Sequence, residues 1–243
     1  MKLHKKKATL FLFDKTGIMA KPWADKGYIC FCFDGQHPAG ITLSSEHKNI
    51  YNVGYWFDTE VSDDALRFNV ASVLDTVKEH DVKFMFSFPE CTDLAVSGAA
   101  HFAKKRAIDP LFQERALMMF KLSVAVANAL GCPYGIENPV SVASTLFRKP
   151  DHIFHPWHYG GYLPENDIHP LYPAHIVPRD AYPKKTCIWS GNGFNMPERK
   201  PVQAPAGHSK QHTKLGGKSL KTKNIRSATP RGFALATFKS NHK

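Results

Sequence analysis

Short apolar runs that alternate with stretches of helical periodicity constrain this chain most. Between the runs, Ala65 to His80 carries apolar residues at helix spacing, and Leu111 to Leu130 begins after Pro110 and ends before a glycine. Regular alternation of strands and helices predicts an α/β fold with a doubly wound, mostly parallel sheet. The runs typical of buried strands are 8–13, 28–33, 50–57, 83–88, 134–139 and 185–189.

The composition is that of a globular chain. It has 243 residues, of which 43% are hydrophobic and 22% charged, enough for one large domain. No apolar run approaches the roughly 20 residues that a membrane span needs. The basic stretch from Met1 to Ala8 is followed by only a short apolar run, unlike a secretory leader. We therefore expect a cytoplasmic protein that does not contact a membrane.

The first strand, helix and second strand form a unit typical of nucleoside-cofactor sites. A turn, Asp14 to Ile18, follows the first strand, and Asp34 ends the second. In such units the turn holds the ligand, and the acid accepts hydrogen bonds from ribose hydroxyls. The turn has a single glycine, Gly17, so it does not match a dinucleotide fingerprint, but a methyl-donor site remains possible.

Two further strand ends carry chemically useful side chains. Cys91 follows the run that stops at Pro89, and Glu137 ends the run that begins at Tyr134. A thiol in this position is either a small buried residue or a nucleophile, and a carboxylate is either a surface or capping residue or an acid of the site. No cysteine pair has the spacing of a zinc finger or a redox motif, and the histidines after Pro150 match no strong zinc signature, so we expect no metal and no disulfide framework.

Positive charge is concentrated near the C-terminus. The net charge is +11, and the segment from Arg199 onward contains 11 Lys/Arg and no Asp or Glu. A segment of this kind favours a polyanionic partner, most often nucleic acid, although a solvated tail is the alternative. The run Lys104 to Arg106, in the expected loop Ala95 to Asp109, is either a solvated face or a set of phosphate contacts.

The order and spacing of these motifs resemble those of the DNA cytosine-5 methyltransferases. Pro89-Glu-Cys91 is similar to the Pro-Pro-Cys motif of that family, with Glu90 in place of the second proline, and Glu137-Asn-Pro139 is similar to its Glu-Asn-Val motif. The resemblance covers nearly the whole chain. Further matching segments are Phe13 to Gly17, Lys185 to Trp189 (with Lys for Arg) and Arg226 to Pro230, while 93–98 and 156–160 resemble short methyltransferase-like proteins of phages and prophages.

The resemblance implies a sheet of the class I S-adenosylmethionine-dependent methyltransferase type, in the host cytoplasm if a phage encodes the chain. It implies that Cys91 attacks the cytosine ring, that Glu137 assists at the ring nitrogen, and that Asn138 positions that carboxylate or the adjoining loop. S-adenosylmethionine is the implied cofactor and DNA, with its base flipped out or already single-stranded, the implied partner. The implied cofactor-binding residues are Phe13, Asp14, Thr16, Gly17, Ile18, Asp34, Asp58 and Pro89. The expected nucleic-acid contacts are Lys104, Lys105, Arg106, Lys185, Lys218, Lys221, Lys223 and Arg226.

The region where the family usually inserts a large target-recognition domain is short here. We expect a catalytic domain over 1–189, a basic loop-rich segment over 190–225 as a small irregular appendage, and a C-terminal helix over 226–243 that returns to the catalytic domain. A segment of this size supplies phosphate contacts but little base readout, which predicts low sequence specificity or a protein partner for recognition. The alternatives are an enzyme that modifies pyrimidine nucleotides or uses another group donor, and a catalytically idle nucleic-acid-binding relative.

Overall fold

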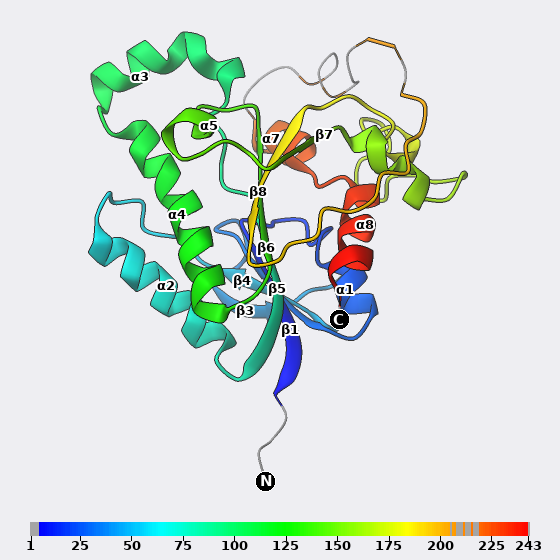
Figure 1. The fold of residues 1–243 in the computed structure, drawn as a ribbon, viewed down its shortest axis with the longest axis horizontal. Helices are drawn as coiled ribbons and strands as arrows, with labels where there is room; N and C mark the ends of the chain where they lie inside the picture. The colour runs from blue at the N-terminus through cyan, green and yellow to red at the C-terminus, as the bar shows by residue number, and fades with distance from the viewer. Residues whose placement is uncertain (1–4, 205, 208–210, 212–214, 216–218, 243) are drawn as a thin grey trace.

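An eight-stranded, mostly parallel sheet organises the chain (Figure 1). The computed structural model describes residues 5–204, 206–207, 211, 215 and 219–242. The strand order is β3-β4-β2-β1-β5-β6-β8-β7, and the α/β class predicted from the sequence is confirmed at this level. The strands are β1 (Lys6–Leu12), β2 (Ile29–Phe33), β3 (Gly40–Leu43), β4 (Ile50–Gly54), β5 (His80–Ser87), β6 (Tyr134–Pro139), β7 (His152–Phe154) and β8 (Thr186–Gly191).

The centre of the sheet is parallel and its edges are not. Strand β1 pairs with both β2 and β5 in parallel, β2 with β4, and β5 with β6. Strand β8 runs antiparallel between β6 and β7, and β3 runs antiparallel to β4 at the opposite edge. From β1 the chain builds outward to β2 and β4, and then returns to the other side of β1 with β5 and β6. The order therefore reverses between β1 and β5, and ligands of open α/β sheets bind outside the carboxyl ends of strands at such a point.

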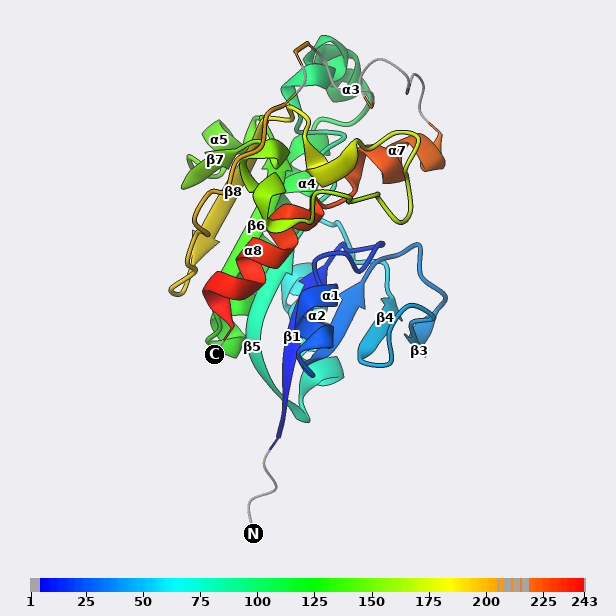
Figure 2. The same cartoon turned by 90° about the vertical axis from the view of Figure 1, so that its right-hand side faces the viewer.

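Helices cover both faces of the sheet (Figures 1 and 2). Helices α2 (Asp63–Val77) and α4 (Phe112–Leu130) pack over one face, and α1 (Lys21–Asp25) and α8 (Arg231–Asn241) pack over the other. The two faces have separate apolar clusters, one containing Leu10 and Phe120 and the other containing Phe84 and Phe233. Because strands buried on both faces need apolar side chains at every position, these central strands read as continuous apolar runs.

Local signals explain where the two long helices begin and end. The side chain of Ser62 accepts a hydrogen bond from the backbone N–H of Ala65 (3.2 Å) and caps the start of α2. Gly131 ends α4 in the left-handed conformation, with φ of 61°. Both helices lie close to their expected bounds, which confirms the predictions from periodicity.

Two segments that were predicted to be loops are partly helical. The segment Ala95 to Asp109 contains a 3₁₀ helix, Val96–His101, and helix α3 (Phe102–Ile108). Helix α3 buries none of its residues, so it has no apolar stripe to reveal it, whereas Ala, Lys and Arg have high intrinsic helix propensity. Helix α7 (Leu220–Ser227) lies mostly in the segment 190–225, which was expected to be loop-rich, and crosses the boundary drawn at 225/226.

The remaining elements were not anticipated from the sequence. They are β3, β7, the short helix α5 (Ala143–Leu146) and two 3₁₀ helices, Pro156–Tyr162 and Pro178–Asp180. Helices α3, α5 and α7 gather at the end of the sheet opposite the N-terminus, beyond the carboxyl ends of the parallel strands (Figures 1 and 2). Within the residues described, no helix combines the length and the apolar character required to cross a bilayer.

Candidate functional site

The loops that follow the parallel strands are tied together at the carboxyl end of the sheet. The backbone N–H of Phe88, after β5, donates to the carbonyl of Leu12 in β1 (3.0 Å). The side-chain amide of the buried Asn138, in β6, donates to the carbonyl of Pro89 (2.8 Å). The structure thus brings the turn after β1, the Cys91 loop and Glu137 to one rim, where the strand order reverses.

The turn after β1 is built around the buried carboxylate of Asp14. One oxygen accepts hydrogen bonds from the N–H of Thr16 (3.0 Å), the hydroxyl of Thr16 (3.1 Å) and the N–H of Gly17 (2.9 Å). The other oxygen, Oδ2, is buried without a hydrogen-bond partner among the described residues. Burial raises the pKa of Asp14 to about 6 against the opposing effect of these hydrogen bonds. Gly17 has φ of 64°, which favours glycine in this turn.

Other expected cofactor-binding residues of the turn lie around this carboxylate. Phe13 also has a positive φ (59°) and packs its ring against Phe57, with centroids 5.2 Å apart. Ile18 packs against a small apolar cluster formed by Ile176, Tyr182 and Ala228. The turn is therefore packed against side chains from other parts of the chain rather than standing free.

Asp34 and Asp58 end neighbouring strands but lie in different settings. Asp34 is half-buried, accepts a hydrogen bond from the N–H of Gln36 (2.8 Å), and has a pKa raised by burial. Asp58 is exposed, and its carboxylate accepts from the N–H of Glu60 (2.9 Å). The backbone of Asp58 is bonded to the side chain of Asn69 in α2. The carboxylate and backbone of Asp58 therefore stabilise the turn in which Asp58 lies. Of these two acids, Asp34 is the one placed as expected for an acid that binds ribose.

Sequence reasoning missed Trp56, which is 79% exposed at the end of β4. A Cβ on Gly35 would lie 2.3 Å from the Trp56 ring, so the ring covers Gly35, directly after Asp34. An exposed indole beside an acid is unusual, because large aromatic rings in folded proteins are mostly buried. The signal available in the sequence was an isolated tryptophan after a strand.

Cys91 lies half-buried in the loop after β5. Its carbonyl accepts the N–H groups of Leu94 (3.0 Å) and Ala95 (2.8 Å), which turns the loop back toward the sheet. Burial raises the pKa of the Cys91 thiol, the negative charge of Glu137 raises it further, and the ammonium of Lys184 opposes both. The other four cysteines are buried and unpaired. Cys91 therefore differs from the other four in being only half-buried, although Glu137 also raises the pKa of the buried Cys187.

Glu90 points away from this site. Its side chain is 72% exposed, accepts a hydrogen bond from the hydroxyl of Thr92 (2.6 Å), and lies 3.6 Å from the ammonium of Lys223 in α7. Its charge raises the pKa of Cys91 less than burial and Glu137 do. The acid that replaces the second proline of the motif is thus a link to α7 rather than a close neighbour of the thiol.

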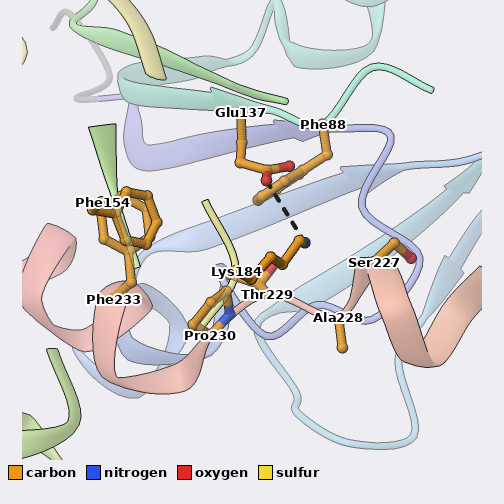
Figure 3. A pocket seen from close by; sticks show the side chains of 9 residues that line it. All are labelled: Phe88, Glu137, Phe154, Lys184, Ser227, Ala228, Thr229, Pro230 and Phe233. Atoms are coloured by element: carbon orange, nitrogen blue, oxygen red, sulfur yellow. Dashed lines mark ion pairs between the residues drawn. The ribbon is translucent and has the colours of Figure 1, made fainter. Parts of the chain in front are cut away.

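Glu137 and Lys184 face each other in a pocket (Figure 3). The Nζ of Lys184 lies 3.8 Å from Oε1 of Glu137, and neither side chain is more than a quarter exposed. Burial raises the pKa of Glu137, and Lys184 partly offsets that rise. The pocket is a small hollow that opens to solvent, and its lining consists of Phe88, Glu137, Phe154, Lys184, Ser227, Ala228, Thr229, Pro230 and Phe233.

The C-terminal segment forms one wall of this pocket. Ser227 to Pro230 line it between α7 and α8, and the carbonyl of Arg226 accepts a hydrogen bond from Lys184 (3.2 Å). The structure therefore brings most of the segment Arg226 to Pro230 next to Glu137. Lys184 was missed, because the strand motif was placed one residue later, at the exposed Lys185.

Some of the side chains expected to contact nucleic acid are bonded to other groups of the protein, and others are on exposed residues. Lys105 pairs with Asp93 and donates to the carbonyl of Thr92, and Arg106 donates to the side chain of Gln113 (2.7 Å). Lys223 lies close to Glu90, as described above. The side chains of Lys104, Lys185, Lys221 and Arg226 are on exposed residues, and Lys218 lies outside the described residues.

In the part of the chain that the structure describes, no three His, Cys, Asp or Glu side chains form a group that could hold a metal ion. Comparison with known proteins gives no identification. No model of a known protein family matches this chain, and no curated protein sequence matches it. A functional conclusion therefore rests on the residues and their arrangement.

Proposed function

We propose that this chain is an S-adenosylmethionine-dependent enzyme that methylates carbon 5 of cytosine in DNA, with low sequence specificity. The observation that carries the proposal is the grouping of Cys91, Glu137 and Lys184 at the carboxyl rim of the sheet, where the strand order reverses. Cys91 is the proposed nucleophile, and Glu137 the proposed acid. The antiparallel strand β8, inserted beside β6, belongs to the proposed class I methyltransferase-type sheet.

The residues around Asp14 fit the proposed cofactor. Its buried Oδ2 lacks a partner among the described residues and would accept a hydrogen bond from, or pair with, a cationic group of S-adenosylmethionine. Asp34 would accept hydrogen bonds from the ribose hydroxyls. When bound, the cofactor would supply an electrophilic methyl group. The turn from Phe13 to Ile18 would hold it on the same rim as Cys91.

The shifted pKa values of Cys91 and Glu137 support a mechanism in which the thiol passes its proton to the carboxylate. With Glu137 ionised, the pKa of Cys91 is raised and the thiol keeps its proton. The raised pKa of Glu137 means that its carboxylate accepts a proton more readily than an exposed glutamate. We therefore assign to Glu137 the proton that Cys91 loses. The transfer removes the negative charge beside the sulfur at the moment the thiolate forms.

The protonated Glu137 then has a task on the ring. As Sγ of Cys91 bonds to carbon 6 of cytosine, Glu137 donates its proton to ring nitrogen 3 and so neutralises the negative charge that the addition places on the ring. Carbon 5 becomes enamine-like and would take the methyl group of the bound cofactor, whose methyl–sulfonium bond breaks and leaves a neutral thioether. A base, such as water, removes the proton of carbon 5, the C–S bond breaks, the C5–C6 double bond re-forms, and nitrogen 3 returns its proton to Glu137.

Nucleoside analysis tests the proposal directly. The protein is incubated with S-adenosylmethionine and cytosine-containing DNA, and the digested nucleosides are weighed by mass spectrometry. We expect 5-methylcytosine from the wild type and none from Cys91→Ser. Cys132→Ala, which removes a buried thiol just before the start of β6, is the matched control and retains activity.

Three results would count against the proposal. Product from Cys91→Ser at the wild-type rate would exclude this nucleophile. A wild type that binds DNA but neither makes product nor binds S-adenosylmethionine by calorimetry would be the idle relative instead. Methylation confined to one site of four to six bases would exclude low specificity.

A further inference from the structure

Helix α7 joins two loops that leave the sheet on opposite sides of β1. The side-chain amide of Asn224 donates to the side-chain oxygen of Gln36 (3.2 Å), in the loop after β2. One residue earlier, the Nζ of Lys223 lies 3.6 Å from Oε1 of Glu90, in the loop after β5. In the sheet β1 lies between β2 and β5. The helix therefore bridges the carboxyl rim across the strand around which the candidate site is built (Figure 2).

The rotation of α7 about its own axis is fixed by its packing. The buried residues of the helix are Thr222 and Ile225, which are three positions apart and so lie on one side. The hydroxyl of Ser219 caps the first turn by accepting the backbone N–H of Thr222 (3.2 Å). Asn224 is half-buried beside this packed side, whereas Lys221 is exposed. The contact of Asn224 with Gln36 is thus part of a packed arrangement.

Gln36 is itself bonded to both parts of the candidate cofactor site. Its backbone N–H donates to the carboxylate of Asp34 (2.8 Å), the acid expected to bind ribose. Its carbonyl accepts a hydrogen bond from the Nζ of Lys15 (3.0 Å), in the turn after β1. A ligand that bonds to Asp34 and fills this turn would therefore hold Gln36, the residue to which α7 is attached.

The other contacts of α7 lead to the proposed reacting groups. Glu90 directly precedes Cys91 in the chain. The carbonyl of Arg226, in the last turn of the helix, accepts a hydrogen bond from Lys184 (3.2 Å), which is the ion-pair partner of Glu137. The position of this one helix therefore bears on the cofactor loop, the nucleophile loop and the acid of the pocket together.

We propose that α7 couples the binding of the cofactor to the binding of DNA, so that each ligand increases the affinity for the other. This inference rests on the proposed function. A ligand at Asp34 orders α7 through Gln36, and a strand laid over Cys91 orders it through Glu90, so the second ligand meets a helix that is already ordered. Such coupling acts equally in both directions. Asn224 and Lys223 act here as positioning residues, through the loops that they hold.

Calorimetric titration measures this coupling. A cytosine-containing 12-mer is titrated into the protein with and without saturating S-adenosylhomocysteine, which lacks the transferable methyl group and so prevents turnover. We expect the wild type to bind the 12-mer about fivefold or more tightly with this ligand present. Asn224→Ala, which changes no charge, and Lys223→Gln should lose most of that factor. Lys221→Gln removes the same charge from an exposed position of the same helix and should keep the factor, although it binds DNA more weakly.

Hydrogen exchange provides a readout of the helix itself. S-adenosylhomocysteine alone should slow amide exchange in 220–227 of the wild type, but not in Gln36→Ala, which removes the partner of Asn224 on the cofactor side. A coupling factor in Asn224→Ala equal to that of the wild type would overturn the inference. A wild type that binds both ligands independently would overturn it too and leave the proposed function standing. A wild type that does not bind S-adenosylhomocysteine would overturn both.

Discussion

At the scale of single residues, the state of Cys91 depends on three charged neighbours of unequal influence. Burial sets the raised pKa of the thiol, Glu137 adds more than Glu90, and Lys184 acts in the opposite direction. We predict that Glu137→Gln lowers the pKa of Cys91 more than Glu90→Gln does, because the Glu90 carboxylate is largely exposed and screened by water. The pH dependence of alkylation at Cys91, followed by peptide mass spectrometry, measures both shifts.

Replacement of Lys184 should shift the pKa of Cys91 in the opposite direction. Lys184→Met should raise the pKa of Cys91, because it removes a positive charge that lowers the pKa of the thiol. Lys185→Met, a change at the exposed neighbouring position, should leave it nearly unchanged. A larger shift from Glu90→Gln than from Glu137→Gln would mean that the motif acid faces the sulfur in solution, and the assignment of Glu137 would then fail.

At the scale of elements, α8 is anchored by a partly buried group of charges at its first residue. The guanidinium of Arg231 pairs with Asp167 and lies 3.6 Å from the carboxylate of Asp180, which is fully buried. Asp180 also accepts the backbone N–H of Gly232 (3.0 Å). These contacts join the start of α8 to the irregular segment between β7 and β8, and they hold the Ser227–Pro230 wall of the pocket.

We predict that Arg231→Leu lowers the free energy of unfolding by about 3–5 kcal/mol, because it leaves the buried Asp180 carboxylate without its cation. Urea unfolding measures the loss. Arg226→Leu, at an exposed position five residues earlier, should change stability by less than about 0.5 kcal/mol. Combining Arg231→Leu with Asp180→Asn should recover part of the loss. Equal effects of the two arginine variants would show that the charge group is not the anchor.

At the scale of the whole molecule, the sequence predicted the sheet's centre better than its edges. Central strands such as β5 and β6 are buried on both faces, so their apolar runs stand out, and the residues that end them mark the rim. Strands β3 and β7 have only four and three residues and carry no such run. Helix α3 was missed because none of its residues is buried, so no apolar stripe marks it in the sequence.

The sequence identified several residues of the candidate site, but not the side-chain contacts between them. The sequence pointed to Cys91, Glu137 and Asn138 because each belongs to a motif at a strand end. The ion pair of Glu137 with Lys184 joins residues 47 positions apart, and the outward direction of Glu90 depends on α7. Such pairings follow from tertiary packing, which no local pattern in one sequence encodes.

Asp14 couples the candidate cofactor turn to the stability of the whole fold. Burial raises its pKa from an ordinary 3.8 to about 6, so between these values the folded chain holds a proton that the unfolded chain has lost. The contribution of Asp14 to the free energy of unfolding therefore falls as pH rises from about 4 to about 6, and stays constant above that. One pKa unit corresponds to about 1.4 kcal/mol, so the fall amounts to about 3 kcal/mol.

Asp14→Asn removes this ionisation while keeping an oxygen that can accept the N–H groups of Thr16 and Gly17. We predict that the difference in unfolding free energy, wild type minus variant, becomes more negative by about 3 kcal/mol between pH 4 and pH 7. Urea titrations at unit pH intervals measure it, with the exposed Asp58→Asn as the control. Bound S-adenosylmethionine, whose cationic groups favour the ionised carboxylate, should shrink the difference. A wild-type-minus-variant difference that is flat across this range would mean that Asp14 titrates as an ordinary carboxylate, and the unpartnered oxygen would then already be solvated.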